Sequence, residues 1–460
     1  MAITAAAGFM AALDNLVVTS ALTAIREDLG GSLPELEWTV SAYSLAFAVL
    51  LMPGAALGDR FGRRRLFTLG LAVFTAASAA AALAPGVEAL IAARAVQGAG
   101  AAVMTPLALL LLTAAVPAAR RGAVLGVYSA VTGVAVAGGP LIGGVLTEHI
   151  SWQWIFWLNV PIGASLIPLA RIRLTESYAP RAPFDVLGAL LIGGGLLGLV
   201  YALVNGHADG WTSVPVLTAA AAGAALLAAF VRHGRTHPHP VLPMRLFRGR
   251  AFAGINAASL LMHLGMFGSI FLLSQYLQGG LGLSPTEAGV RMLPWTAAPL
   301  LVAPFAGRLA DRVGGGPVVA AGLGLQAAGL ALFALVLEPG VPYAALLPAL
   351  IAGGVGMGLF YAPAASVLMS SVVPAERGAA SGANNALREV GGVLGIAVLG
   401  AVFASRGGFA SPEDFRGGVA AALWTGAAAV ALGCLAALLV PARPAPKPVP
   451  AAAGRASAAG

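Results

Sequence analysis

The stretch AITAAAGFMAALDNLVVTSALTAI, residues 2–25, is mostly apolar and contains a single charged residue, Asp14. A membrane-spanning helix needs about 20 mostly apolar residues, so this stretch is long enough to cross a bilayer. A charged side chain at the centre of such a helix costs about 2.5–3.5 kcal/mol on insertion scales, and such residues usually serve a function. The stretch therefore predicts a membrane protein, with Asp14 as its first candidate functional residue.

The composition of the whole chain agrees with a membrane protein. Its 460 residues are 59% hydrophobic and only 10% charged, whereas soluble domains are about 25% charged. The net charge of +8 comes from arginines in short gaps between apolar runs, a pattern typical of membrane orientation rather than of nucleic-acid binding. A single cysteine, Cys434, excludes an internal disulfide and a multi-cysteine metal site. No GxxxxGK[ST] phosphate-binding loop occurs, which excludes this type of ATP site.

The apolar runs predict fourteen membrane-spanning helices. These lie near residues 2–24, 37–57, 66–84, 88–114, 121–146, 152–171, 184–204, 214–231, 251–277, 287–306, 316–337, 342–371, 378–405 and 418–441. With this assignment most of the 26 basic residues lie in the connections on one side of the membrane. The connections on the other side contain only Arg26, Arg406 and Arg416. Because basic residues favour the cytoplasmic side, both termini are predicted to be cytoplasmic.

Three sequence pairs indicate an internal repeat. LGDRFG at 57–62 reappears as LADRVG at 309–314, PAARRGAVLG at 117–126 resembles PAERGAASG at 374–382, and GAGAAVMTP at 98–106 resembles GVGMGLFYAP at 354–363. The separation along the chain is similar in all three pairs, which favours two homologous halves.

The repeat and the spans together predict an all-α membrane protein with four segments. Residues 1–172 form a six-helix bundle, 173–250 a linker with two extra spans and a basic loop, 251–441 a second six-helix bundle, and 442–460 a disordered tail. Two halves around a central site suit transport by alternating access.

Several motifs along the chain resemble those of the major facilitator superfamily, specifically its 14-span drug:proton antiporter branch. They are LDNLVVTSALTAI at 13–25, GDRFGRRR at 58–65, RAVQGAGAAVMTP at 94–106, GGPLIGG at 138–144, SWQWIFWLNVPIG at 151–163 and NNALREVGGVLGIAVLG at 384–400. The chain departs from the usual pattern at Leu16, Thr19, Thr23 and Ala55. The resemblance implies a transporter with two six-helix bundles that exports drugs or antibiotics.

Asp14 and Arg94 are the first candidates for proton coupling. At 1.5 Å per residue, Asp14 lies about 18 Å from one membrane surface and Arg94 about 10 Å from the other, so both reach a similar depth in a core about 30 Å thick. An ion pair would keep the carboxylate ionised, and its loss would favour proton capture. The same pair would also serve as a static link between two helices. Glu389, near the middle of the thirteenth span, is a second candidate for proton or substrate binding, unless it and Arg388 satisfy each other.

Candidate gating residues lie in the short loops and in one glycine-rich span. The loop candidates are Asp59, Arg60, Gly62 and Arg63, with Asp311 and Arg312 in the repeat. Asp59 would accept hydrogen bonds from a helix N-terminus of the neighbouring bundle; the arginines would also set membrane orientation. The span candidates are Gly139, Pro140, Gly143 and Gly144, which the resemblance implies form a hinge and seal, although small residues also serve ordinary helix packing.

Polar and aromatic residues of several spans are candidates for substrate binding. They are Trp38, Tyr43, Gln97, Asn256, His263, Phe267, Asn384, Asn385 and Arg388. Alternatives remain for each group: Trp38 would also anchor a helix at the membrane surface, and the polar residues 256–263 would form a seam between helices. His233, His237 and His239 lie in the basic loop RHGRTHPHP, which favours a solvated loop over a metal site.

These observations predict a proton-coupled antiporter that exports small lipophilic molecules, with cations among the candidates. It is expected in the bacterial cytoplasmic membrane, as a monomer among membrane lipids, with protons as the coupling ion and with no other cofactor, metal or nucleic acid. One alternative is an importer or uniporter of the same fold. Another is a membrane-embedded enzyme or sensor, but the spans show no nucleophile–base or metal-ligand spacing.

Overall fold

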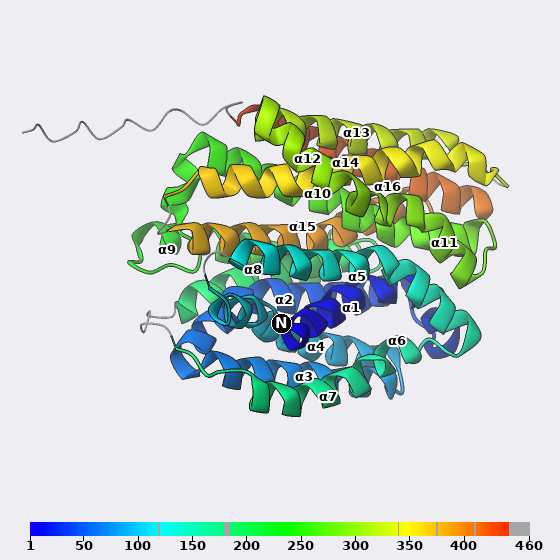
Figure 1. The fold of residues 1–460 in the computed structure, drawn as a ribbon. Coiled ribbons are helices and arrows are strands. Elements are labelled where there is room, and N and C mark those ends of the chain that lie inside the picture. Colours follow the sequence, from blue (N-terminus) through cyan, green and yellow to red (C-terminus); the bar gives the residue numbers. More distant parts are fainter. Residues whose placement is uncertain (118–119, 179–184, 339, 374–375, 409–410, 441–460) are drawn as a thin grey trace, which may run out of the picture.

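The structure is a computed structural model that describes residues 1–460 except 118–119, 179–184, 339, 374–375, 409–410 and 441–460. The described residues form helices and no β-strand (Figure 1). The first seven helices are α1 (Ala2–Leu29), α2 (Leu33–Phe61), α3 (Arg63–Ala82), α4 (Val87–Ala114), α5 (Arg121–His149), α6 (Trp154–Trp157) and α7 (Asn159–Arg173). The predicted disordered tail, 442–460, lies outside the described residues.

The chain continues with two helices that belong to neither repeat and then with the second half. The two are α8 (Val186–Asn205) and α9 (Val214–Thr236), followed by the 3₁₀ turn η2 (Met244–Arg248). The second half contains α10 (Arg250–Gln275), the π-turn η3 (Tyr276–Gly280), α11 (Pro285–Thr296), α12 (Ala298–Val313), α13 (Gly315–Val336), α14 (Tyr343–Ser370), α15 (Arg377–Arg406) and α16 (Pro412–Leu438).

Thirteen helical segments in the described part of the chain are long and apolar enough to cross a membrane. They coincide with thirteen of the predicted spans. The remaining predicted span, 287–306, is occupied by two shorter helices, α11 and α12, which meet at Ala297. Pro299 lacks the backbone N–H that would bond the carbonyl oxygen of Trp295, so its position interrupts the helix there.

The helices pack mainly within two groups. In the first group α2 and α3 pack on α4, α1 packs on α5, and α3 packs on α7. In the second group α10 packs on α15 and α16, and α13 packs on α14 and α16. Figure 1 shows α1–α4 and α7 on one side of the molecule and α13, α14 and α16 on the other. The groups meet where α5 contacts α11 and where α2 contacts α15, and α8 covers the second junction.

The sequence repeat is also visible in the backbone. Gly62 lies between α2 and α3 with φ 108°, and Gly314 lies between α12 and α13 with φ 95°. A side chain is unfavourable at such positive φ angles, so glycine is needed in both tight connections. Pro106 and Pro363 lie inside α4 and α14 respectively. The matching sequences therefore occupy matching places.

The connections fall at two ends of the bundle. We call the end with the start of α1 and the arginines at 60–65 the basic end, and the end with the α1–α2 connection the opposite end. One hydrophobic core joins Leu16–Ile25 of α1 to the second half near the opposite end, whereas a separate core near the basic end contains first-half residues alone. Outward-facing leucines such as Leu190 and Leu301, 67% and 73% exposed, suit contact with lipid.

Candidate functional site

Asp14 and Arg94 form an ion pair in the interior of the first half. Asp14 comes from α1 and Arg94 from α4, and their side chains are completely buried. The predicted pairing of these residues is therefore present in the structure. A buried ion pair is costly to desolvate and depends on further hydrogen bonds to satisfy its remaining polar atoms.

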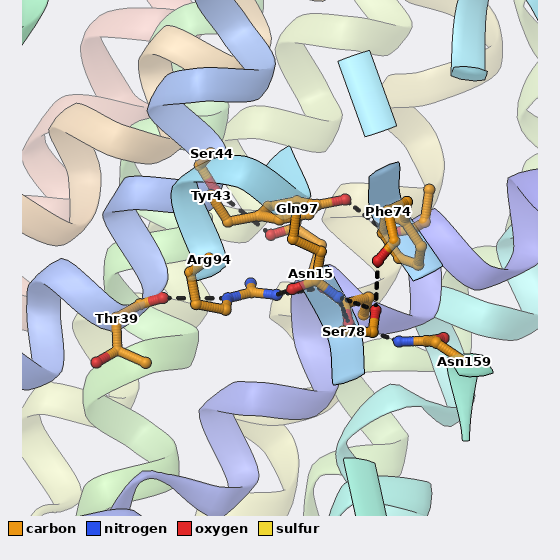
Figure 2. Close-up of polar contacts among 11 residues, drawn as sticks. Asn15, Thr39, Tyr43, Ser44, Phe74, Ser78, Arg94, Gln97 and Asn159 are labelled. Atoms are coloured by element: carbon orange, nitrogen blue, oxygen red, sulfur yellow. Dashed lines mark hydrogen bonds and ion pairs between the residues drawn. The ribbon is translucent and has the colours of Figure 1, made fainter. Parts of the chain in front are cut away.

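Neutral polar side chains from three helices supply those hydrogen bonds. Gln97 Nε2 donates to Asp14 Oδ1 at 2.8 Å and to Ser78 Oγ of α3 at 2.7 Å. Asn159 Nδ2, from the start of α7, donates to the same carboxylate oxygen at 2.9 Å. Figure 2 shows Arg94, Gln97, Ser78 and Asn159 converging on one point. The carboxylate thus receives donors from α4 and α7 as well as the arginine.

Arg94 also links this network to α2. Its Nε donates to the carbonyl oxygen of Thr39 at 3.2 Å, and its Nη1 donates to Gln97 Oε1 at 2.6 Å. The guanidinium carbon lies 4.3 Å from the centroid of the Tyr43 ring, within the range of a cation–π contact. Tyr43 is itself 1% exposed and donates to the carbonyl oxygen of Ala11 at 3.3 Å. A displacement of Tyr43 would therefore directly change the cation–π contact of Arg94.

A cavity of about 250 Å³ lies between the two halves, next to this network. The first half lines it with α1, α2, α4 and α5, and the second half with α10, α11, α14 and α15. Its aromatic walls are Tyr43, Phe47, Tyr128, Phe267 and Tyr361. Asp14 is not part of the wall, because Tyr43 and Asn15 line the cavity beside it.

The second half contributes a polar cluster to the cavity. Arg388 Nε donates to His263 Nε2 at 2.9 Å, and its guanidinium lies over the ring of Tyr361. His263 Nδ1 is 2.8 Å from the carbonyl oxygen of Ser259, so the hydrogen-bond pattern assigns the proton of this histidine to Nδ1. Glu389 lines the same cavity and forms no ion pair with any residue that the structure describes. The cavity wall therefore contains one carboxylate and one guanidinium.

Several predicted binding residues lie away from the cavity wall. Trp38 packs against the core shared by α2, α8 and α15, because five positions along a helix turn it to a different face from Tyr43. Gln97 belongs to the Asp14 network. Asn256 and Asn384 hydrogen bond to each other across α10 and α15, and Asn385 makes no hydrogen bond within the described chain. The predicted cavity residues that do line it are Tyr43, His263, Phe267, Arg388 and Glu389.

The loop candidates at the basic end form contacts within the first half and with the first residues of the linker. Arg63 Nε donates to Asp59 Oδ1 at 2.7 Å, and Gly62 lies between them. The N-terminus of α3 is capped by Glu176, which accepts from the backbone N–H groups of Arg64 and Arg65. Among the residues that the structure describes, Asp59 accepts no hydrogen bond from the neighbouring bundle in this conformation.

The repeat of this loop lacks the corresponding ion pair. Gly315 stands where the first copy has Arg63, and Asp311 and Arg312 are exposed, as Arg60 is. Hence the two copies share their backbone turn, but only the first can form the Asp–Arg pair.

The predicted glycine-rich segment lies at the junction between the halves. Cβ atoms added at Gly139 and Gly143 would collide with Leu16 and Val17 of α1, and one added at Gly144 would collide with the backbone at Pro285 of α11. On the other side, Gly289 of α11 lies against the carbonyl of Pro140. The absence of side chains lets α5 fit between α1 and α11.

Hydrogen bonds between the halves lie toward the opposite end in the described chain. Ser274 of α10 and Gln278 of η3 donate to the carbonyl oxygens of Thr19 and Ser20 respectively, and Thr23 donates to Gln275 of α10. Glu148 at the end of α5 accepts from Thr286 N at the start of α11, at 2.9 Å. Thr296 of α11 donates to the carbonyl oxygen of Ala137 at 2.9 Å. The opposite end is thus closed in this structure.

Sequence reasoning missed several neutral residues of the site. Ser78, Asn159, Tyr128 and Tyr361 gave no signal because serine, asparagine and tyrosine are common in spans, whereas charged residues in apolar runs are conspicuous. Asn159 lies within the motif SWQWIFWLNVPIG, and the structure places it at the start of α7.

The one group of residues with metal-ligand geometry in the described chain is Asp185, His233 and His237. Asp185 is already fully engaged: Oδ1 accepts from Gly188 N and from His233, and Oδ2 accepts from Val241 N. Burial raises the pKa of Asp185, but these hydrogen bonds outweigh it and hold the pKa below its ordinary value. The arrangement is explained by a helix cap that ties α8 to α9.

Comparison with known proteins places this geometry in a family. The sequence profile of the Major Facilitator Superfamily matches residues 4–254 and 255–459. The tetracenomycin C resistance and export protein of Streptomyces glaucescens is 36% identical over 88% of this chain and 76% of its own length. The methylenomycin A resistance protein of Streptomyces coelicolor is 37% identical over 95% of this chain and 91% of its own length. The multidrug resistance protein Stp of Mycobacterium tuberculosis is 37% identical over 86% of this chain and 74% of its own length.

A solved structure gives independent support for the fold. A transporter of the POT family, crystallised with a thioalcohol-conjugated peptide, superimposes with a TM-score of 0.70 over 94% of each chain, at 14% sequence identity. The chain is a transporter rather than an enzyme. It belongs to the major facilitator superfamily, among the multidrug and antibiotic efflux transporters.

Proposed function

We propose that this chain is a proton-coupled exporter with fourteen spans, in which α11 and α12 together form the tenth. The basic end faces the cytoplasm of a bacterium and the opposite end faces outward. Protons move inward through the protein as a small lipophilic molecule moves outward. The basic residues at 60–65 support this orientation, since such residues favour the cytoplasmic side.

The observation that carries the proposal is the buried Asp14–Arg94 pair behind Tyr43. An intramembrane carboxylate can bind and release a proton, and a charge that crosses 100 mV gains about 2.3 kcal/mol. When Asp14 takes up a proton, its Coulomb attraction to Arg94 is lost. Arg94 keeps its bonds to Thr39 and Gln97, so α4 stays joined to α2, while α1 is held to α4 only by weaker contacts such as the hydrogen bond from Gln97 to Asp14.

Helix α1 can transmit this change to the closed end. The residues Thr19 and Ser20 follow Asp14 by less than two helical turns and accept the hydrogen bonds from Ser274 of α10 and Gln278 of η3. A shift of α1 therefore acts on the contacts that hold the opposite end closed. Substrate in the cavity contacts Tyr43, whose ring forms a cation–π contact with the guanidinium of Arg94. Proton and substrate thus act on the same arginine from different sides.

The cavity favours a lipophilic, partly aromatic substrate. Its wall is mainly aromatic and aliphatic, and such walls bind flat apolar molecules by packing. Glu389 provides a carboxylate for a cationic or hydrogen-bonding group, and Arg388 a guanidinium for an acceptor. Two relatives are named for tetracenomycin C and methylenomycin A, which makes these antibiotics suitable first substrates to test.

The test uses everted membrane vesicles with an acidic interior. Ethidium, tetracenomycin C and methylenomycin A are offered to vesicles that contain the wild type or Asp14→Asn at equal amounts. We expect the wild type to accumulate at least one compound, and Asp14→Asn to lose accumulation driven by the pH gradient. Equal accumulation by both would contradict coupling through Asp14. A lack of accumulation of any compound by the wild type would count against this substrate class.

A further inference from the structure

Glu37 is a buried carboxylic acid that the ion-pair network does not use. It lies on α2 near the opposite end and is 2% exposed. Its Oε2 is buried and has no hydrogen-bond partner, and no basic residue within the described chain forms an ion pair with it. Asp14, by contrast, has an arginine and two amide donors.

The carboxyl group lies at a junction between the two halves. A Cβ atom added at Gly400 of α15 would be only 2.8 Å from Glu37 Oε2. Glycine at this position therefore makes room for the acid against the α15 backbone. Because α2 belongs to the first half and α15 to the second, the carboxyl group is covered by the other half of the transporter.

A small side cavity of about 190 Å³ adjoins the carboxyl group. Its wall comes from the start of α2, the end of α8 and the end of α15, and is mostly apolar. His207, in the turn after α8, is the other titratable residue of the wall. Among the charged groups on neighbouring elements, Arg94 of α4 pairs with Asp14, Glu35 of α2 caps Ser32, and Arg406 at the end of α15 is exposed.

An ionised carboxylate in this position would lose its hydration without gaining a partner. The desolvation cost is much larger for a charged carboxylate than for the neutral acid. Separation of α2 from α15 would admit water and remove that cost. The charge state of Glu37 is therefore linked to the contact between the two halves, in the way that any ligand is linked to the state that binds it better.

We propose that Glu37 is a second proton-binding carboxyl group, which holds a proton while the opposite end is closed and ionises when that end opens to water. The inference rests on the proposed function in one respect, since it assigns the opposite end to the outside of the cell. External acid then promotes closure of the outward-open transporter, which is the return step of an exporter that exchanges substrate for protons. The proton on Glu37 controls the gate and is separate from the proton on Asp14.

The test measures closure directly, without substrate or a gradient. Spin labels are attached to cysteines at Glu27 on α1 and Ser405 on α15, exposed residues near the opposite end of the two halves, in full-length protein with Cys434→Ala in lipid nanodiscs. The distance distribution is recorded from pH 5 to pH 8.5. The variants are wild type, Glu37→Gln as a mimic of the neutral acid, Glu37→Asp, and His207→Gln as the control for the other titratable group.

We expect the closed population of the wild type to rise as the pH falls. Glu37→Gln should be closed at all pH values, whereas Glu37→Asp and His207→Gln should keep the pH dependence. The same dependence in Glu37→Gln as in the wild type, no dependence in the wild type, or its loss in His207→Gln would each overturn the inference. Asp14→Asn should still close with pH. Its failure in vesicle transport therefore tests the proposed function separately from the role of Glu37.

Discussion

Asp14 lies in a site that is built for a charged carboxylate. Its two oxygens face the guanidinium of Arg94 and the amides of Gln97 and Asn159. Arginine suits this place better than lysine because its planar group can donate to Asp14, Thr39 and Gln97 in fixed directions. The site is therefore sensitive to the loss of either partner.

A double-mutant comparison tests this sensitivity. Arg94→Gln should lower the free energy of unfolding by about 3–5 kcal/mol, because it leaves a buried carboxylate without its charge partner. Combining it with Asp14→Asn should restore part of that loss, since the unpaired charge is then gone. Thermal unfolding in detergent ranks the stabilities of the wild type, the two single variants and the double variant. Additive losses in the double variant would show that the two side chains do not depend on each other.

The sequence located the charged residues of the site but not their surroundings. Asp14 and Arg94 were found because charges are rare in apolar runs. Asn159 and Ser78 were missed because neutral polar residues occur throughout the spans. The direction of a side chain around its helix also could not be read reliably, which is why Trp38 was grouped with Tyr43, although they face different neighbours.

At the scale of elements, the fit of α5 between α1 and α11 decides whether the opposite end can close. A Cβ at Gly144 would lie 2.6 Å from the carbonyl carbon of Pro285 and 3.0 Å from the Cα of Thr286. Both are backbone atoms, which cannot move aside without moving α11. Gly126, on the same helix, has no atom within 4 Å of an added Cβ.

Gly144→Val should therefore hold the opposite end open, and Gly126→Val serves as the matched control. We expect Gly144→Val to reduce transport at least tenfold at normal expression and to shift the distance between labels at Glu27 and Ser405 to longer values. The control should resemble the wild type in both measurements. A wild-type distance in Gly144→Val would mean that α5 and α11 do not meet as described.

The cap of α8 provides a second prediction at this scale. Asp185 accepts hydrogen bonds from Gly188, His233 and Val241. Asp185→Ala should lower the free energy of unfolding by about 1–2 kcal/mol, the usual effect of removing an N-cap with such contacts.

The pH dependence of this contribution follows from the lowered pKa of Asp185. The stabilisation is complete above the unfolded pKa of about 3.9 and is lost as the pH falls through the lower folded value. The difference in melting temperature between wild type and Asp185→Ala should therefore be smaller at pH 3 than at pH 5. A difference that is as large at pH 3 as at pH 5 would contradict this.

The elements themselves were predicted well because apolar runs and loop arginines specify spans directly. The break between α11 and α12 at Ala297 was missed, although Pro294 and Pro299 both lie within the predicted span 287–306. Proline can kink a helix or end it, and the choice depends on the neighbouring helices. Likewise, the positive φ of Gly62 and Gly314 agrees with the repeated loop motif. The capping of α3 by Glu176, by contrast, could be found only from the structure.

For the whole molecule, the structure corresponds to one of the two states of the proposed alternating-access cycle, the state in which the opposite end is closed. Hydrogen bonds and a shared core close the opposite end. Among the residues described, the loop at the basic end bonds to the first half and the start of the linker, and not to the second half. A sequence alone does not reveal which state is populated. Reversal of this pattern, with Asp59 bonded to the second half, is the expected arrangement of the other state.

The central proposal is that export of the substrate is coupled to the movement of protons through Asp14. Proteoliposomes that contain the transporter and a trapped pH-sensitive dye measure this exchange without any other energy source. A compound that the wild type accumulates in everted vesicles is added outside, at equal pH on both sides and with the membrane potential clamped. The account predicts that the lumen becomes more alkaline as the compound enters through the wild type, and that Asp14→Asn gives no such change. Entry of the compound through the wild type without a change in lumen pH would contradict it.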